Sequence, residues 1–595
     1  MAKAQKTTES TVSLISDDPE IQKPRLIKLI IKNFRCIGTK PVSIDLNDIV
    51  VLVGSNNVGK SSILKAYELA MSQGSNEGKL KIEDFPNGII DGENLPEIEL
   101  HTIVYDNTPG ERWITELSTG EKLVKERWVW AKEGESKREG WDAQTKNWSE
   151  QVPWGAPNVA NSRRPEPHRV DAFAPPEAQA KVIKELLMKA INDKVKNLKS
   201  ANQDSEQNGY HQLLASVKNL QKEIVKETQE QIDSVNNELT SLIEKVFPNY
   251  KIDFDAKPEN DLDKTINLFK ADTQLLMGPK DGYLSTIENQ GSGARRTMLW
   301  TALKFISENN YKGKVETSVR PHLLLIDEPE ICLHPNAIRD VCNVLYDLPN
   351  TGNWQVMVTT HSPIFIDFAR DNTTIVKVEK NINGEIEGTT VFRPDKVQLD
   401  DDDKSNLKLL NICDPYVAEF FFGGKVIVVE GDTEYTAFNY IKAQKPKEYK
   451  NIHIIRARGK ATIVSLIKIL NHFGTSYSVL HDSDTPQITT KTNKTIASPA
   501  WGNNPKILQA INAKTAEVET RLLASLPNFE EAYFGDSIQS EKPYNALKSI
   551  SNDPAKFKII EMLLNALIHH DAQIPMNCAE WKSIKDLEDQ LSSLL

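Results

Sequence analysis

The feature that most constrains this chain is the run VVLVGSNNVGKSS at Val50–Ser62. Its four apolar residues, Val50–Val53, predict a buried strand, and Gly54–Ser61 fits the pattern G-x-x-x-x-G-K-[ST]. Apolar residues at helical spacing then follow from Ile63 to Ala70. A strand, a glycine-rich loop and a helix in this order present backbone N–H groups and a helix N-terminus to phosphate. The run therefore predicts a P-loop that binds a nucleoside triphosphate.

Two side chains of this loop have defined tasks in nucleotide binding. A lysine at the position of Lys60 adds a mobile positive charge beside the β- and γ-phosphates. A hydroxyl at the position of Ser61 can bind Mg²⁺. The residues expected to surround ATP here are Gly54, Ser55, Asn56, Asn57, Gly59, Lys60, Ser61 and Ser62.

Length and composition fit a globular protein of several domains. A chain of 595 residues allows about two to four domains, and 39% of its residues are hydrophobic and 26% charged. The five cysteines form no C-x-x-C pair, which argues against a disulfide framework or a zinc knuckle and indicates the cytoplasm. Because no apolar run reaches membrane-spanning length, we expect no membrane partner. The net charge of −11 decides nothing about nucleic acid, since a metal-dependent nuclease centre is itself acidic.

Two later strands end in residues suited to ATP hydrolysis. The apolar run Leu323–Ile326 is followed by Asp327, a candidate Mg²⁺ ligand, and by Glu328, which could polarise the attacking water. The run QVMVTT ends in His361, which could touch the γ-phosphate or that water. A strand-end histidine and paired acids are individually common, but their order after a P-loop favours the functional interpretation.

A second glycine-rich helix start lies upstream of these strands. Gly291–Gly293, in the run ENQGSGARR, opens a predicted helix. Glycines at a helix N-terminus form an anion-binding nest, so Ser292 and Gly293 are candidate nucleotide contacts.

These motifs together resemble the ATP-binding-cassette ATPase heads of the structural-maintenance-of-chromosomes and recombination-protein group. NFR at Asn33–Arg35, the P-loop, QGSG, LLIDEPE and TTHSP stand in that group's order. The resemblance implies ATP and Mg²⁺ as ligands, with Arg35 near the nucleotide. It also implies that the signature of one subunit completes the ATP site of another, which makes a homodimer or higher homo-oligomer. The signature lacks a full LSGGQ, and Asp84 is only a weak substitute for the missing Q-loop glutamine.

The rest of the first two thirds of the chain is less regular. Residues 1–24 are polar and predict a disordered tail. A strongly helical pattern over about 176–247 predicts a helical insertion, after which the sheet should resume near 250 and 274. The acidic run at 399–406 indicates a linker. Between 128 and 176 we expect an irregular insertion with a basic patch of Arg163, Arg164, His168 and Arg169.

A second set of acids follows strands in the last third. The run KVIVVEGDTE predicts a strand that ends in Glu430, then a sharp turn and a helix that carries Glu434. A later strand ends in the run HDSD, where alternation along an extended segment would place Asp482 and Asp484 on one face. Carboxylates placed in this way can share a metal ion.

An acid at one strand end and D-x-D at a later one are the layout of a Toprim domain, and VVEGDTE…GK…LHDSD fits it. An ATP-binding-cassette head followed by a C-terminal Toprim domain resembles the overcoming-lysogenization-defect (OLD) family of ATP-dependent nucleases. Gabija and retron-associated defence effectors contain relatives of this family. The resemblance implies Mg²⁺ or Mn²⁺ at the acids, a further acid, and a lysine that stabilises the transition state. The corresponding residues are Glu430, Glu434, Asp482, Asp484, either Glu530 or Glu531, and Lys542.

We therefore expect an α/β protein in which an ABC/SMC-like P-loop ATPase head with a helical insertion precedes a Toprim domain. The expected bounds are 25–415 for the head and 420–595 for the Toprim domain. The expected activity is ATP-regulated, metal-dependent cleavage of nucleic acid, with DNA favoured, in anti-phage defence. A retron nucleic acid or a helicase-like protein could be a partner. The main alternative is a non-cleaving, ATP-switched DNA clamp. A topoisomerase would need a nucleophilic tyrosine domain and a primase a zinc module, and we identify neither.

Overall fold

The structure is a computed structural model. It describes residues 24–594 apart from 173, 185–186, 188–232, 245–246, 248, 256–273, 310–320, 352–353, 368–369, 371, 381–383, 385, 394–396, 398, 490–492 and 536–539. The predicted tail, except Pro24, and most of the predicted insertion at 176–247 lie outside the described residues. The two ends of that insertion, 176–184 and 233–244, are helical. Among the helices that are described, none is both long and apolar enough to cross a membrane.

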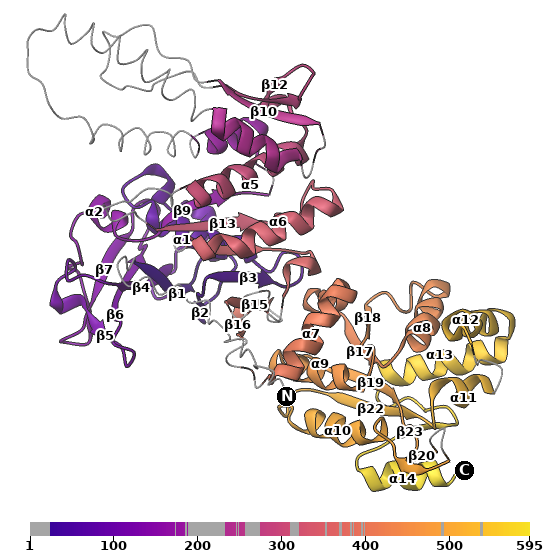
Figure 1. Cartoon of the computed structure of the whole chain (residues 1–595). Coiled ribbons are helices and arrows are strands. Elements are labelled where there is room, and N and C mark those ends of the chain that lie inside the picture. The colour runs from indigo at the N-terminus through magenta and orange to yellow at the C-terminus, as the bar shows by residue number, and fades with distance from the viewer. Residues whose placement is uncertain are drawn as a thin grey trace, which may run out of the picture.

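A six-stranded sheet forms the centre of the first half of the chain (Figure 1), in the order β16–β15–β3–β14–β13–β9. All neighbours pair in parallel except β16, which is antiparallel to β15. Strands β3, β13 and β14 are buried on both faces, which explains their nearly continuous apolar sequences. The strands are β3 (Ile49–Val53), β9 (Glu166–Val170), β13 (His322–Asp327), β14 (Trp354–Thr359), β15 (Thr373–Lys380) and β16 (Ile386–Phe392).

An antiparallel sheet lies beside it, in the order β2–β1–β4–β6–β7–β8, with β5 (Thr115–Glu116) paired to β6. Helix α1 (Lys60–Met71) shares one hydrophobic cluster with both sheets, through residues such as Leu64 and Tyr67. Strands β1 and β2 form an antiparallel hairpin, and β4 pairs with the other side of β1. The other strands are β1 (Arg25–Lys32), β2 (Val42–Asp45), β4 (Glu97–Val104), β6 (Lys122–Val129), β7 (Lys137–Asp142) and β8 (Asn147–Ser149).

The irregular insertion predicted at 128–176 is wrong. This segment completes the antiparallel sheet with β7 and β8, forms the short helix α2 (Pro157–Ser162), and ends in β9. Strand β9 joins the parallel sheet as its edge strand, pairing with β13 from Glu166↔His322 to Val170↔Ile326. The sequence of β9, EPHRV, has only one fully buried residue and a proline. It therefore lacks the apolar pattern by which a strand is recognised.

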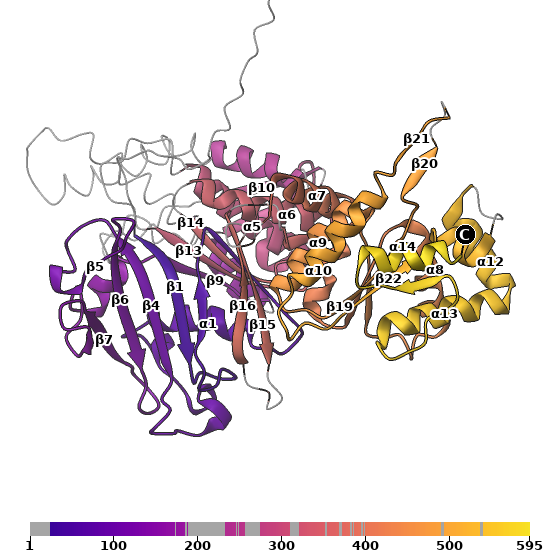
Figure 2. The same cartoon turned by 90° about the horizontal axis from the view of Figure 1, so that it is seen from below.

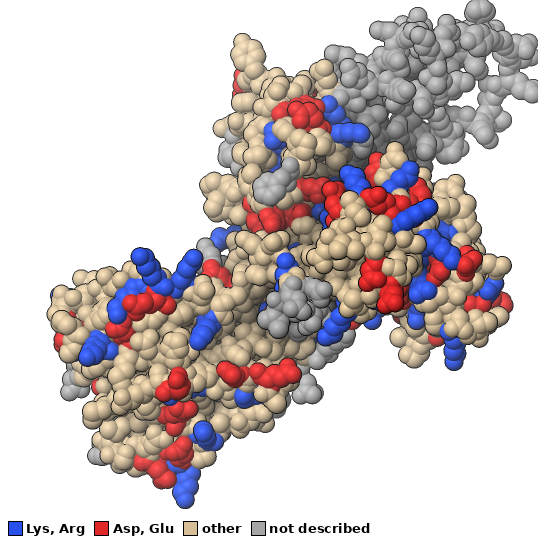
Figure 3. All heavy atoms as spheres, turned by 180° about the vertical axis from the view of Figure 1, so that it is seen from behind, with Lys and Arg blue, Asp and Glu red and all other residues tan. Residues whose placement is uncertain are grey.

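The predicted basic patch does not form either. The Arg164 side chain is fully buried and donates to both Glu126 oxygens, at 2.6 and 2.8 Å. His168 Nε2 lies 3.0 Å from His322 Nδ1, and both rings contact Trp354. Only Arg163 is substantially exposed. On the face drawn in Figure 3, basic and acidic side chains of the described residues are interspersed.

The strands near 250 and 274 do not resume the main sheet. They are β10 (Tyr250–Asp255) and β11 (Gln274–Pro279), which form a separate sheet with β12 (Ser285–Thr286). Helix α5 (Ser292–Asn309) follows this small sheet, and α6 (Pro335–Asp347) follows β13. Residues of both helices pack in the cluster that also holds Leu324 and Val356 of the central sheet.

The last third of the chain has its own five-stranded sheet, in the order β18–β17–β19–β22–β23. Only β23 (Cys578–Glu580) is antiparallel to its neighbour; β17 (Lys425–Val429), β18 (Ile452–Arg456), β19 (Tyr477–Asp482) and β22 (Thr520–Ser525) are parallel. A hairpin of β20 (Gln487–Thr489) and β21 (Thr495–Ala497) projects from this domain (Figure 2). The helices are α8 (Asp432–Gln444), α9 (Lys460–His472), α10 (Asn504–Asn512), α11 (Phe529–Phe534), α12 (Lys542–Asn552), α13 (Pro554–Ile568) and α14 (Ile584–Ser592).

The acidic run predicted as a linker is instead the start of helix α7 (Asp401–Cys413). Asp400 caps this helix by accepting from Asp403 N at 2.8 Å, and acids in a first turn suit the helix dipole. Asp403 in turn accepts from Ser465 Oγ of α9 at 2.7 Å. The run is acidic because it caps a helix and binds the neighbouring domain.

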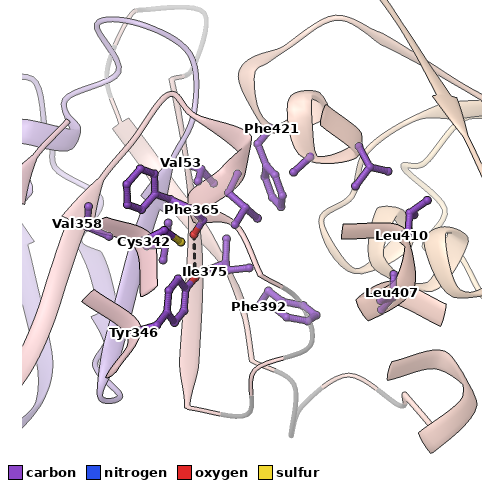
Figure 4. Close-up of a cluster of buried hydrophobic side chains, with 14 of the residues drawn as sticks. Val53, Cys342, Tyr346, Val358, Phe365, Ile375, Phe392, Leu407, Leu410 and Phe421 are labelled. Carbon is purple, nitrogen blue, oxygen red and sulfur yellow. Dashed lines mark hydrogen bonds between the residues drawn. The ribbon is translucent and has the colours of Figure 1, made fainter. Parts of the chain in front are cut away.

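The six-stranded sheet and the five-stranded sheet meet at a joint. One continuous hydrophobic cluster at this joint contains side chains from both halves of the chain. The turn η8 (Pro415–Phe422) follows α7 and leads into β17. Its Phe421 lies in the same cluster as Val53, at the end of β3, and Phe365 (Figure 4). Leu407 and Leu410 of α7 belong to this cluster too, as do buried side chains of β17 and β19.

Candidate nucleotide and nuclease sites

The predicted P-loop lies where β3 ends and α1 begins. Gly54 and Gly59 have φ angles of 143° and 89°, and a Cβ atom there would lie 2.4 Å from Val378 O and from Cys36 Sγ, respectively. Both positions therefore require glycine, for conformation and for space. Ser55, Asn56 and Asn57 are exposed at the tip of the loop, so they can face a ligand. Lys60 Nζ donates to Gly54 O and Ser55 O within the loop, at 3.0 and 2.9 Å.

Ser61 and Asp327 lie in contact, as a shared cation would require. Ser61 Oγ donates to Asp327 Oδ1 at 2.9 Å, although 266 residues separate the two in sequence. Thr359 Oγ1, at the end of β14, donates to the same oxygen at 2.5 Å. Thr359 was not predicted from the sequence; the signal that could have indicated it is its place at the end of an apolar strand. A hydroxyl and a carboxylate at the N-terminus of α1 are hard oxygen donors of the kind that Mg²⁺ binds.

Glu328 and His361 face one another beside this pair. His361 Nε2 lies 3.5 Å from Glu328 Oε1. Burial, and then the neighbouring Asp327, raise the pKa of Glu328. Burial and the charge of Lys60 lower the pKa of His361. A second residue that was not predicted is Glu330. It holds the loop that carries His361, because its Oε1 accepts from His361 N at 2.6 Å and from Thr360 Oγ1 at 3.0 Å.

The described hydrogen bonds of Lys60 involve neither Arg35 nor the signature residues. Arg35 Nε donates to Asp84 Oδ1 at 2.8 Å, so the arginine and the weak Q-loop substitute form a pair. Ser292 and Gly293 begin α5 and line a cavity of about 400 Å³ with Leu333 and His334. The P-loop residues line a different cavity. Ser292 and Gly293 are not among the residues that line the cavity at the P-loop.

Four carboxylates gather in the last domain. Glu430 follows β17, Glu434 lies in the first turn of α8, Asp482 ends β19, and Glu530 lies in α11. Burial raises the pKa of Glu434 to about 8 and holds the pKa of Asp482 well above its usual range. The charges of neighbouring acids within the group raise both pKa values further.

Hydrogen bonds fix the orientation of these acids. Asp482 N donates to Glu430 Oε2 at 3.1 Å, and Phe529 N donates to Asp482 Oδ1 at 2.8 Å. Thr433 Oγ1 donates to Glu530 Oε1 at 2.8 Å. Buried carboxylates are normally paired or bound to a cation. The donor set, all carboxylate oxygen, suits Mg²⁺ or Mn²⁺.

The remaining predicted residues are placed differently from one another. Glu531 points away from the group: its side chain is exposed and accepts from Asn528 Nδ2 at 2.7 Å. Of the two glutamates left open by the sequence, only Glu530 lies with the other acids. Lys542 begins α12 and is half-exposed, with its Nζ 3.3 Å from Glu530 Oε2.

The alternation that would have aligned Asp482 with Asp484 is wrong. Strand β19 ends at Asp482, and Asp484 has a φ angle of 57°, so the segment between them is not extended. Asp484 instead contacts the buried Lys460, the first residue of α9. Asp484 still lies close enough to Glu430 that its charge contributes to the raised pKa of Glu430, whose largest cause is burial. Lys460 was not predicted as a site residue, although it is the lysine of the GK in the Toprim pattern.

Known proteins show both halves of this arrangement. Residues 25–108 and 174–366 match the AAA ATPase domain, and residues 421–484 match the Toprim domain of overcoming lysogenization defect-like proteins. The Old nuclease of Escherichia phage P2 is 23% identical over 475 residues, which cover 77% of each chain. The OLD nuclease of Thermus scotoductus is 28% identical over 165 residues, covering 27% of this chain and 30% of that one. A solved Smc head bound to the C-winged helix domain of ScpA overlaps 62% of this chain and 99% of its own, at 14% identity; the TM-score of 0.37 is too low to assign a fold.

The fold and the two sites define an enzyme class, an ATPase that carries a Toprim catalytic domain. Within that class, the chain is similar to the Old nucleases, and its Toprim domain matches that of overcoming lysogenization defect-like proteins. Use of a nucleotide and of a divalent metal follows from the two domains.

The raised pKa values predict how stability depends on pH without metal. The pKa of Glu434 rises from 4.5 to about 8 on folding, so its contribution to stability is full below about pH 4.5 and is lost as the pH rises through about 8. In EDTA, we expect the Tm of the wild type to fall from pH 6 to pH 8.5 more steeply than that of Glu434→Gln. Mg²⁺ or Mn²⁺ should remove much of the difference. If Tm falls equally steeply with pH for the two proteins in EDTA, the raised pKa of Glu434 is contradicted.

Proposed function

We propose that this chain is an ATP-regulated, metal-dependent endonuclease that cleaves DNA in anti-phage defence in the cytoplasm. The observation that carries the proposal is a group of carboxylates, the buried Glu434 and Glu530 and the partly buried Glu430 and Asp482, at the carboxyl ends of neighbouring parallel strands and the helices beside them. Carboxylates that repel one another and are buried together have a cost in stability that a bound cation offsets. The match to a Toprim domain and the similarity to the Old nuclease support nucleic acid as the substrate.

In this proposal the four acids hold one or two divalent cations. When bound, such a cation activates water and neutralises the leaving oxygen of the phosphodiester. Phe529 N and Thr433 Oγ1 keep Asp482 and Glu530 turned toward the common centre. Lys542, half-exposed beside Glu530, is placed to approach a substrate phosphate and stabilise its negative charge. Lys460 holds Asp484 at the edge of the site.

At the nucleotide site, Lys60 would bind the β- and γ-phosphates, and Ser61 and Asp327 would hold Mg²⁺. Glu328 would orient the attacking water, with His361 beside it. Two features agree with these roles: the direct Ser61–Asp327 hydrogen bond and the 3.5 Å approach of His361 to Glu328. Arg35, through its bond to Asp84, would stabilise the loop next to the P-loop.

ATP regulation would pass through the joint between the sheets. A cavity of about 460 Å³ is lined by Ser55–Val58 of the P-loop on one side and by Phe420, Phe421, Gly423 and Gly424 on the other. The His361 ring lies 5.7 Å from the ring of Phe422. From Phe422 the chain runs through two glycines into β17 and on to Glu430. A shift of His361 upon γ-phosphate binding would therefore reach a nuclease acid through eight residues of chain.

A nuclease assay tests this proposal. Supercoiled plasmid, linear duplex and single strands are incubated with Mg²⁺ or Mn²⁺, each with no nucleotide, with ATP and with a non-hydrolysable analogue. We expect metal-dependent cleavage of plasmid and a change of rate with ATP. If DNA is bound in an ATP-dependent way but never cut with any metal, the non-cleaving clamp replaces the nuclease. If ATP changes neither binding nor cutting, the regulatory part of the proposal fails.

The separation of signature and P-loop predicts an oligomer. Because Ser292 and Gly293 line a cavity of their own, a second subunit would have to bring its signature to each bound ATP. We therefore expect light scattering to give at least twice the 67.0 kDa mass of the chain in the presence of ATP. A Glu328→Gln variant, which should retain ATP, is the best sample for this measurement. A monomer that hydrolyses ATP at full rate would contradict the composite site. A retron nucleic acid or helicase-like protein remains the proposed defence partner.

A further inference from the structure

Arg169 reaches the nucleotide site from a strand that the sequence did not reveal. It lies in β9, the edge strand of the parallel sheet, directly opposite Leu325 of β13. Residues in register on neighbouring strands share a face of the sheet, and so do residues two apart on one strand. Arg169 is therefore on the same face as Asp327, and that face is covered by α1, the helix that follows the P-loop.

The contacts of Asp327 are divided between its two oxygens. Oδ1 accepts from Ser61 Oγ and Thr359 Oγ1. Oδ2 faces Arg169, whose Nη2 lies 3.7 Å away. The guanidinium group and the Ser61 hydroxyl therefore approach different oxygens of the carboxylate.

Arg169 itself is held firmly. Its side chain is 12% exposed, and its Nε donates to Asp171 Oδ1 at 2.6 Å. Its Nη1 is buried and makes no hydrogen bond within the part of the chain that the structure describes. Because the guanidinium group is planar, fixing Nε on Asp171 also fixes the direction of both Nη groups. Asp171 also balances the charge of Arg169, which limits repulsion of a cation bound nearby.

We propose that Arg169 is a positioning residue for the divalent cation of bound ATP: it holds Oδ2 of Asp327 so that Oδ1 points to the cation beside Ser61. The inference rests on the proposed role of Asp327 as a cation ligand. Groups that orient a metal ligand without touching the metal commonly affect metal affinity by about 10- to 100-fold. Arg169 would act in this way, through Asp327, and would not contact the phosphates.

The test is a Mg²⁺ titration of the binding of a fluorescent ATP analogue to the full chain. Arg169→Ala should raise the Mg²⁺ concentration at half-maximal binding by about 10- to 100-fold. Binding of the analogue in EDTA, which depends on Lys60 and the loop backbone, should stay within about twofold of wild type. Arg169→Lys, which keeps the charge but loses the planar fork, should give an intermediate shift. Arg163→Ala is the matched control, because Arg163 is exposed and pairs only loosely with Asp106, at 3.8 Å.

Three outcomes would overturn the proposal. An unchanged Mg²⁺ midpoint in Arg169→Ala removes the positioning role. An equal loss of binding with and without Mg²⁺ means that Arg169 supports the fold or contacts phosphate. If Arg169→Ala does not fold, the Arg169→Lys variant is used in its place. A wild-type Mg²⁺ midpoint in Arg169→Lys would show that the planar guanidinium group of Arg169 does not position Asp327. Asp327→Asn tests the proposed role of Asp327 separately from that of Arg169. An unchanged Mg²⁺ midpoint in Asp327→Asn refutes the role of Asp327 as a cation ligand.

Discussion

Asp482→Ala abolishes nucleic-acid cleavage, lowering the rate by several orders of magnitude, if the acids hold the catalytic metal. Asp482 ends β19 between Glu430 and Glu434, and burial with these neighbours holds its pKa well above the usual range. Without its carboxylate the cation loses a central ligand. ATP hydrolysis should remain largely intact, because Asp482 has no contact with the P-loop among its described hydrogen bonds. The measurement is plasmid cleavage and phosphate release by the same preparation.

Two further variants make this result interpretable. Asp482→Asn keeps the acceptor for Phe529 N, so it separates loss of charge from loss of the hydrogen bond. Glu531→Ala is the matched control, because Glu531 is the exposed neighbour of Glu530 on the same helix. We expect Glu531→Ala to cut at the wild-type rate. If Asp482→Ala also cuts at that rate, the carboxylate group is not the nuclease centre.

Lys60→Ala should remove ATP binding altogether, whereas Glu328→Gln should retain it and slow hydrolysis by about 10²-fold or more. The two variants are expected to differ because the two side chains lie in different places. Lys60 lies within the loop and binds its carbonyls, while Glu328 lies at the end of β13, facing His361. Equilibrium binding of a fluorescent ATP analogue and steady-state phosphate release measure the two effects separately.

Lys65→Ala is the control for the lysine. It lies on the same helix but pairs with Glu68 at 2.9 Å and is partly exposed, so its loss should leave ATP binding unchanged. Normal turnover by Glu328→Gln would move the role of general base to another group, of which Glu330 and His361 are the nearest described candidates.

Much of the site follows from where apolar strands end. The runs before Gly54, Asp327 and Glu430 are buried on both faces, and such strands have a pattern that sequence reading detects. Because parallel strands bring their carboxyl ends to one edge, the residues that follow them are brought together without knowledge of the fold. For this reason the Ser61–Asp327 contact, across 266 positions, could be expected from the sequence.

The residues that were not predicted, or were placed wrongly, lie in segments without an apolar strand pattern. Strand β9 is an edge strand with a polar sequence, so Arg169 was assigned to a loop. The direction of Asp484 depends on a positive φ angle at a non-glycine residue, which alternation cannot predict. Glu530 and Glu531 are adjacent, and only the rotation of the short helix α11 decides which of them is buried. These three outcomes depend on tertiary packing.

The shared cluster at the joint also bears on how such chains can change in evolution. Phe421, Leu407 and Leu410 are buried in a cluster that also contains Val53, Phe365 and Ile375 of the ATPase half (Figure 4). Each half alone would therefore expose apolar side chains at this joint. A recombination event that exchanged the Toprim domain at β17 would leave large aromatic side chains facing an unmatched partner, at a cost of several kcal/mol, about 3–5 for each phenylalanine whose packing is lost. Inheritance of α7, η8 and the domain that follows as one block avoids that cost, so ATPase and nuclease would diverge together as a pair and not as interchangeable modules.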